Sequence, residues 1–309
     1  MSTPGTVSVL IPTFKRPLGL ARAIASVTGQ TRLPDEIVVV DNDPEASARE
    51  LVEDLARDSR VPLVYVHEAN PGVSHARNAG FSRATGHFIA QLDDDEGARP
   101  EWLESLLKTR QTLDTPVVFG PVTPLATGQG PMVTAMLERL YARTGPEADD
   151  YRTRDWGCGN SLLDRAALTL PDPVFDPRTN ETGGEDDVLF VTLQKQGVRF
   201  GWSAGAEVIE FVEGSRVHWK HLLARSFAYG QGASQNCVHA GGVNVPALAG
   251  WMAVGAGQAL VYGLAALPAA LAGGPKAGAL CIDKAVQGTG KLIWAESLAP
   301  RFYGAAARG

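Results

Sequence analysis

Short apolar runs alternate with helical patterns along the first third of the chain. Four runs rich in β-branched residues predict strands, at about residues 7–11, 36–40, 63–67 and 87–92. Between them, apolar residues recur at helical spacing, as Leu20, Ile24 and Val27 do on one face. Strand–helix units repeated in this way predict a doubly wound, mainly parallel sheet with helices on both of its faces.

The pattern changes in the rest of the chain. Residues 117–212 are less regular, with strands expected at 117–119 and 208–212 and a helix from Glu185 to Gly197. The segment from Ser226 to Pro275 contains no Asp, Glu, Lys or Arg. We therefore expect the C-terminal third to form apolar helices rather than further strand–helix units.

Composition and charge restrict the class of protein. The chain is 44% hydrophobic and 20% charged with a net charge of -6, which is typical of a globular protein and argues against a general affinity for nucleic acid. The three cysteines are far apart and form no C-x-x-C pair, so we expect neither disulfides nor a zinc site. This cysteine content fits a protein of a reducing compartment best. The polar N-terminus has no signal-peptide pattern, so secretion is not expected.

A run of acids follows the fourth predicted strand: Asp93, Asp94, Asp95 and Glu96. Adjacent carboxylates repel one another unless a cation neutralises them, and oxygen ligands suit Mg²⁺ or Mn²⁺. Asp93 and Asp95 would point the same way if the strand continued. A solvated acidic loop is the alternative for this run alone. Thr13 and Asp41 also follow predicted strands. Because ligands of such sheets bind at the carboxyl ends of the strands, this agreement favours a binding site.

Several segments taken together resemble glycosyltransferase family two. They are residues 9–13 (Val-Leu-Ile-Pro-Thr), 38–43, 70–80 and 92–95, and their order and spacing match the family. The chain is most similar to bacterial enzymes of exopolysaccharide synthesis, such as the succinoglycan glucosyltransferases. The resemblance covers about residues 7–232. It implies a Rossmann-like α/β fold of the glycosyltransferase A type, with a mixed, mostly parallel central sheet and a C-terminal helical extension.

The resemblance also implies a division of the chain. We expect a nucleotide-sugar glycosyltransferase domain over residues 1–235. Its nucleotide-binding half would cover about 1–115 and its acceptor half about 116–235. Residues 236–309 would form an apolar helical extension that associates with a membrane.

The family's motifs assign roles to particular residues. The residues expected around the nucleotide are Pro12, Thr13, Asp41, Arg77 and Asp93. Asp95 would be the main protein ligand of Mg²⁺ or Mn²⁺, together with Asp93. His218 would join them on a segment that closes over the diphosphate. The alternatives are a turn hydroxyl for Thr13, a turn or helix cap for Asp41 and an exposed helical charge for Arg77.

A second group of acids, Glu185, Asp186 and Asp187, follows two glycines at the start of a predicted helix. Acids at this position also stabilise a helix N-terminus, so a structural role is the alternative. Sugar transfer requires a base that takes the proton of the acceptor hydroxyl. The resemblance assigns this role to Asp186, with Glu185 orienting the acceptor, and implies inversion at the anomeric carbon.

Three weaker candidates are expected near the acceptor or the diphosphate. They are Trp156, Asn160 and Arg225. A core aromatic, a tight turn and a charge on a surface helix are the respective alternatives.

The apolar stretch 247–267 is long enough to cross a bilayer, which requires about 20 residues. A helical hairpin packed on the catalytic domain or lying in the interface is the alternative to a span. We expect a docked or interfacial helix at the cytoplasmic face of the inner membrane, with Lys276 and Lys284 facing anionic lipid. A lipid-linked glycan acceptor would account for that location.

The sequence therefore predicts an inverting hexosyltransferase of exopolysaccharide or surface polysaccharide synthesis, with glucose as the expected sugar. A sugar-1-phosphate nucleotidyltransferase is the second enzyme class, but the glycine-rich loop expected after its first strand is absent. A dehydrogenase is disfavoured because no G-x-G-x-x-G follows that strand. The non-enzymatic alternative is a glycan-binding scaffold, against which the presence of Asp93, Asp95 and Asp186 together argues.

Overall fold

The computed structural model describes residues 5–152, 157–180, 183–239, 242–300 and 302. The chain divides into two compact units. The α/β unit contains residues 1–123, 143–211 and 301–309, and the helical unit contains residues 124–142 and 212–300.

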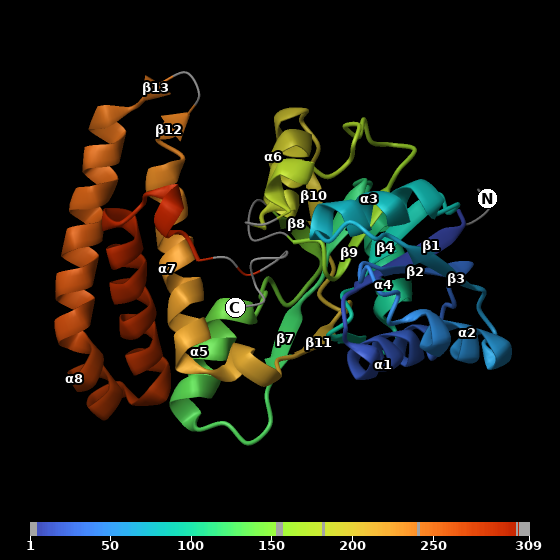
Figure 1. The fold of residues 1–309 in the computed structure, drawn as a ribbon, viewed down its shortest axis with the longest axis horizontal. Helices are drawn as coiled ribbons and strands as arrows, with labels where there is room; N and C mark the ends of the chain where they lie inside the picture. Colours follow the sequence, from blue (N-terminus) through green and yellow to red (C-terminus); the bar gives the residue numbers. More distant parts are fainter. Residues whose placement is uncertain (1–4, 153–156, 181–182, 240–241, 301, 303–309) are drawn as a thin grey trace. The chain divides into compact units, whose positions relative to one another are not determined.

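The α/β unit is built on a mixed sheet of eight strands in the order β3-β2-β1-β4-β9-β6-β10-β8 (Figure 1). These strands are β1 (Val7–Thr13), β2 (Glu36–Asp41), β3 (Leu63–His67), β4 (Phe88–Gln91), β6 (Val117–Phe119), β8 (Asp150–Arg152), β9 (Ser161–Asp164) and β10 (Phe200–Trp202). Strands β1 to β4 are parallel neighbours, whereas β9 runs antiparallel between β4 and β6. A smaller sheet contains β5 (Glu96–Ala98), β11 (Val208–Phe211) and β7 (Val122–Leu125).

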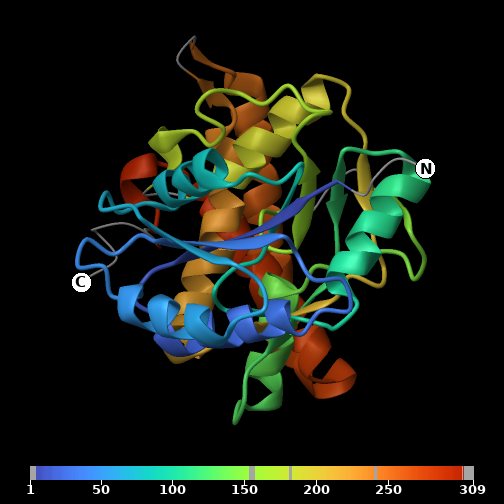
Figure 2. The same ribbon diagram turned by 90° about the vertical axis from the view of Figure 1, so that its right-hand side faces the viewer.

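Helices cover both faces of the large sheet, as Figure 2 shows for the helices drawn in blue and cyan. They are α1 (Pro17–Thr28), α2 (Arg49–Asp58), α3 (Val73–Arg83), α4 (Trp102–Leu113) and α6 (Glu185–Lys195). Buried residues of α1, α2 and α4 pack with Val9 and Ile11, whereas those of α3 and α6 pack with Leu10. Neighbouring residues of β1 thus enter opposite cores, as strand geometry requires. The predicted α/β fold with a mixed, mostly parallel sheet is confirmed.

The helical unit consists of α5 (Pro131–Tyr141), α7 (Trp219–Gln235), α8 (Val245–Leu292) and the short strands β12 (Val238–His239) and β13 (Gly242–Val243). Helix α8 breaks at Gly274, whose φ of 75° is not helical. Its two arms pack against each other, and the second arm runs beside α7 (Figure 1). A partly buried ion pair of 2.6 Å joins Arg139 of α5 to Asp283 of α8. Because α7 packs along α8, residues 219–235 group with the tail rather than with the strands that precede them.

Candidate active site

The carboxyl ends of β1 and β2 bring two predicted residues together. Thr13 and Asp41 are partners in the parallel register, and Pro12 lies one residue earlier on β1. The Thr13 hydroxyl donates a hydrogen bond of 2.8 Å to Asp94 Oδ2. The buried Asp41 carboxylate accepts bonds from two backbone amides of the following turn and from the Tyr65 hydroxyl. The nucleoside-binding roles of Pro12, Thr13 and Asp41 stay predictions.

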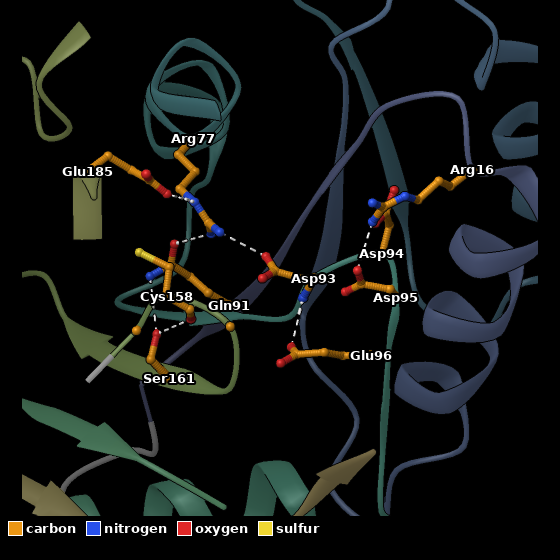
Figure 3. Close-up of polar contacts among 12 residues, drawn as sticks. Arg16, Arg77, Gln91, Asp93, Asp94, Asp95, Glu96, Cys158, Ser161 and Glu185 are labelled. Atoms are coloured by element: carbon orange, nitrogen blue, oxygen red, sulfur yellow. Dashed lines mark hydrogen bonds and ion pairs between the residues drawn. The ribbon is translucent and has the colours of Figure 1, made fainter. Parts of the chain in front are cut away.

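The four acids after β4 have different surroundings. The Asp94 and Glu96 side chains are buried, whereas those of Asp93 and Asp95 are 35% and 13% exposed. Asp93 is directed towards Arg77 and Asp95 towards Arg16 (Figure 3). Strand β4 ends at Gln91, so the condition on which Asp93 and Asp95 were expected to point the same way, a continued strand, is not met. The chain turns after β4, and the Glu96 amide donates to the Asp93 carbonyl at 3.0 Å.

One buried arginine connects this acidic loop to the second predicted acidic site. Arg77 of α3 donates from Nη2 to Asp93 Oδ1 at 2.9 Å and from Nε to Glu185 Oε1 at 3.3 Å. Its third contact is Gln91 Oε1 at 3.3 Å (Figure 3). The two groups of acids, which lie far apart in sequence, thus meet at a single guanidinium. The predicted contact of Arg77 with the nucleotide stays a prediction.

A glycine turn passes between the two acidic sites. Asp186 Oδ2 lies 3.5 Å from the position that a Cβ atom would take on Gly157. A Cβ atom on Gly159 would lie 2.8 Å from Asp93 Oδ2 and 2.7 Å from Glu96 Oε1. A Cβ atom at 159 would therefore force the Asp93 and Glu96 carboxylates to shift, and glycine avoids this contact. Gly157 thus borders Asp186 and Gly159 borders Asp93.

Arg143 holds this turn in place. Its buried guanidinium donates to the carbonyl oxygens of Gly157, Gly159 and Asn160 at 3.1, 2.5 and 2.8 Å. Burial lowers the pKa of Arg143 to about 10, so it still carries its charge near pH 7. Sequence reasoning missed this residue because 143 is far from every motif.

Asn160 differs from its predicted role. Its side chain is completely buried, and its Oδ1 accepts a bond of 2.8 Å from the Trp102 indole. Its Nδ2 donates to the carbonyl oxygens of Pro121 and Ala206, both at 2.8 Å. With these polar atoms engaged inside the core, Asn160 is a packing residue rather than the acceptor contact that we expected.

The remaining candidates lie elsewhere in the chain. Trp156 is outside the described residues. His218 and Arg225 belong to the helical unit, where His218 precedes α7. Arg225 stacks over the Tyr141 ring at 4.5 Å and donates to the Tyr229 hydroxyl at 3.0 Å. The metal and diphosphate roles of His218 and Arg225 stay predictions.

Burial raises the pKa values of several acids at the site. Burial raises the pKa of Glu185 to about 7, although the Arg77 charge favours the ionised form. Burial likewise raises the pKa of Asp94 to about 6 against the opposing effect of Arg16. Burial and the neighbouring Asp93 raise the pKa of Glu96 well above its ordinary value. Such clustered shifts are typical of functional sites.

These shifts predict how stability depends on pH. The folded chain keeps the Glu185 proton to about pH 7, whereas the unfolded chain releases it near 4.5. Within that window the folded state binds more protons, so the free energy of unfolding falls as pH rises. We expect Glu185→Gln to reduce this slope by up to about 1.4 kcal/mol per pH unit. Urea unfolding from pH 5 to 8 measures it, with the exposed Glu53→Gln as control. Equal slopes in the wild type and Glu185→Gln would contradict the shift.

The donor set of the acidic loop fits a divalent cation only in part. Among the described residues, no three His, Cys, Asp or Glu side chains gather around one point that would hold a metal ion. Mg²⁺, however, is commonly bound by one or two carboxylates together with substrate phosphates and water. The carboxylate oxygens of Asp95 and Asp93, the two more exposed acids of the loop, meet that requirement. A cation here would take its other ligands from a bound diphosphate.

Comparison with known proteins adds independent information. Residues 8–169 match the domain described as glycosyl transferase family 2. Succinoglycan biosynthesis protein ExoM of Rhizobium meliloti (strain 1021) is 32% identical over 228 residues, which cover 73% of each chain. Glucosyl-dolichyl phosphate glucuronosyltransferase of Haloferax volcanii is 34% identical over 122 residues, 38% of each chain. The crystal structure of S. aureus TarS matches with a TM-score of 0.50 and 15% identity over 72% of this chain and 39% of that one, a likeness of fold.

Proposed function

The chain belongs to glycosyl transferase family 2 and is a glycosyltransferase, and from this premise we propose that it moves a hexose from a nucleotide-diphosphate sugar to an acceptor hydroxyl with inversion. Its similarity to the succinoglycan biosynthesis protein supports a place in exopolysaccharide or surface polysaccharide synthesis. We further propose glucose as the sugar and a lipid-linked glycan as the acceptor.

The contact that carries this proposal is the Arg77 bridge between Asp93 and Glu185. It joins the loop that would face the donor diphosphate to the N-terminus of α6, which bears Asp186. Asp186 is half-buried next to Gly157, whereas Glu185 is buried and paired with Arg77. Of these two acids, Asp186 is therefore the one that can meet an acceptor.

The reaction is a single displacement. Asp186 accepts the proton of the acceptor hydroxyl while the oxygen of that hydroxyl forms a bond to the anomeric carbon. The bond from that carbon to the diphosphate oxygen breaks, and the electron pair leaves with the nucleoside diphosphate. Attack from the face opposite the leaving group inverts the configuration. Arg77 and Arg143 keep their charges near these acids and fix the geometry of α6 and the glycine turn.

A Mg²⁺ or Mn²⁺ ion held by Asp95 and Asp93, when bound, neutralises the charge that develops on the departing diphosphate. Asp95 and Asp93 would hold the ion from the loop after β4, and Glu96 fixes that loop by accepting a bond of 2.9 Å from the Asp93 amide.

A donor screen tests the proposed reaction. Purified protein is incubated with Mn²⁺ and a panel of nucleotide sugars, and the released nucleoside diphosphate is measured with and without glycan acceptors. We expect one donor to be hydrolysed slowly and transferred faster. Release of pyrophosphate from a nucleoside triphosphate and a sugar phosphate would instead indicate a nucleotidyltransferase. No turnover of any donor would argue against the proposal.

The helical unit supports association with a membrane. Five apolar side chains on the first arm of α8 are 60% to 79% exposed: Leu260, Val261, Leu264, Leu267 and Leu271. Among the described residues, α8 is long and apolar enough to cross a membrane, although it breaks at Gly274. We propose that this arm lies in the lipid interface at the cytoplasmic face of the inner membrane.

The membrane proposal predicts a large effect of two polar substitutions on lipid binding. Leu264 and Leu267 would move from water into lipid, and burial of a leucine contributes about 1.5–3 kcal/mol. We expect Leu264→Ser with Leu267→Ser to weaken binding to phosphatidylglycerol-containing vesicles by at least about 100-fold. Sedimentation with vesicles measures this. Leu18→Ser changes an equally exposed leucine of α1 and serves as control. Equal losses in both proteins would contradict the assignment to α8.

A further inference from the structure

Arg16 forms ion pairs with two acids of the acidic loop, Asp94 and Asp95. It lies between β1 and α1, and its Nη1 is 2.9 Å from Asp94 Oδ1 and 2.7 Å from Asp95 Oδ2 (Figure 3). Its side chain is 46% exposed, whereas those of Asp94 and Asp95 are 7% and 13% exposed. One exposed cation therefore neutralises two mostly buried carboxylates.

The Asp94 carboxylate is held more firmly than the Arg16 guanidinium. Asp94 also accepts the Thr13 hydroxyl at 2.8 Å. The backbone of α1 approaches this loop closely, because a Cβ atom on Gly19 would lie 2.5 Å from the Asp94 carbonyl oxygen. Arg16, by contrast, has a long, half-exposed side chain. If one member of this cluster moves when a ligand binds, the guanidinium is the one with freedom to do so.

The position of Arg16 conflicts with a metal ion at the same carboxylate. The Arg16 guanidinium carries a positive charge at neutral pH, as arginine side chains do. A divalent cation on Asp95 would face this charge at close range and be repelled. A diphosphate brought with the cation would remove the conflict, because guanidinium groups bind phosphate oxygens through paired hydrogen bonds.

We propose that Arg16 stands in for the divalent cation at Asp95 while the donor is absent, and turns to the donor diphosphate when cation and donor bind together. The inference rests on the proposed cation at Asp95. It makes metal binding depend on the nucleotide: the protein binds free Mn²⁺ weakly and binds Mn²⁺ with a nucleoside diphosphate tightly.

The experiment compares Mn²⁺ affinity with and without uridine diphosphate. Electron paramagnetic resonance of free Mn²⁺ measures its binding to the wild type, Arg16→Gln, Arg16→Lys and the control Arg57→Gln, which alters an exposed arginine of α2. For Arg16→Gln we expect about tenfold tighter binding of Mn²⁺ alone and about tenfold weaker binding of Mn²⁺ with uridine diphosphate. Arg16→Lys keeps the charge and should bind Mn²⁺ alone as weakly as the wild type. Thermal melting verifies that each variant folds.

The outcomes separate this inference from the proposed function. If the wild type binds Mn²⁺ with uridine diphosphate but Arg16→Gln leaves the affinity for Mn²⁺ alone unchanged, the role of Arg16 is overturned while the donor site stands. If Arg16→Lys binds Mn²⁺ alone as tightly as Arg16→Gln, charge is not the cause and the inference also fails. If Mn²⁺ binds neither alone nor with the nucleotide, the result contradicts both the proposed cation site at Asp95 and the proposed role of Arg16.

Discussion

Replacement of Asp186 by asparagine is expected to lower kcat by about 10²–10⁴-fold, the usual contribution of a general base. Asparagine has nearly the same shape but cannot take the acceptor proton at neutral pH. The donor does not depend on this group for binding, so its KM should change by no more than about twofold. Initial rates of nucleotide release over a range of donor and acceptor concentrations measure both quantities.

The adjacent Asp187 provides a matched control. Asp187 is exposed on α6, and its own backbone amide donates to Asp186 Oδ1 at 2.9 Å. Asp187→Asn removes the same charge one residue away and should retain most of the activity. If Asp187→Asn loses turnover and Asp186→Asn does not, the base is Asp187 rather than Asp186. If both retain full activity, the base lies outside α6.

The environment of Glu185 explains why it is not the base in this assignment. Its carboxylate is buried and pairs with Arg77 at 3.3 Å, so an acceptor hydroxyl would have to displace an internal ion pair to reach it. Asp186 instead borders the Gly157 backbone and is partly open. The two acids thus have different roles. Glu185 fixes the start of α6 through Arg77, and Asp186 remains available for the acceptor.

Local patterns were sufficient to predict most of the elements. The four N-terminal strands and the helix that begins at Glu185 lie within a few residues of their predicted bounds. Leu20, Ile24 and Val27 are all buried in α1, as their spacing indicated. These features depend on neighbours in sequence, so periodicity reveals them. The adjacency of Thr13 and Asp41 could also be predicted, because the carboxyl ends of parallel strands lie at the same edge of a sheet.

Features that depend on distant residues could not be predicted in the same way. The antiparallel insertion of β9 between β4 and β6 has no local signature in Ser161–Asp164. The pairing of Arg77 with Glu185 joins residues 108 positions apart. Asn160, which follows the glycines of its motif, is buried in the core, where it accepts a hydrogen bond from Trp102. In each case tertiary packing, rather than the motif itself, determines what the side chain contacts.

Replacement of Asp95 by asparagine is expected to lower kcat/KM for the donor by at least about 100-fold at low Mn²⁺ concentration. Asparagine keeps one oxygen ligand but loses the negative charge that holds the cation, so the ion and the diphosphate bind less tightly. A higher Mn²⁺ concentration should restore part of the activity, because the defect lies in metal occupancy. Titration of the transfer rate with Mn²⁺ measures the shift, and Asp58→Asn, at the exposed end of α2, is the control.

The two substitutions at this ion pair should act on Mn²⁺ in opposite directions. Asp95→Asn removes a ligand, so it should weaken Mn²⁺ binding with and without uridine diphosphate. Arg16→Gln removes a competitor for the same carboxylate, so it should strengthen binding of Mn²⁺ alone. A purely structural ion pair would give the same sign in both variants, because each breaks the contact of 2.7 Å between Arg16 and Asp95. An Asp95→Asn protein whose activity is unchanged at every Mn²⁺ concentration would exclude Asp95 as the metal ligand.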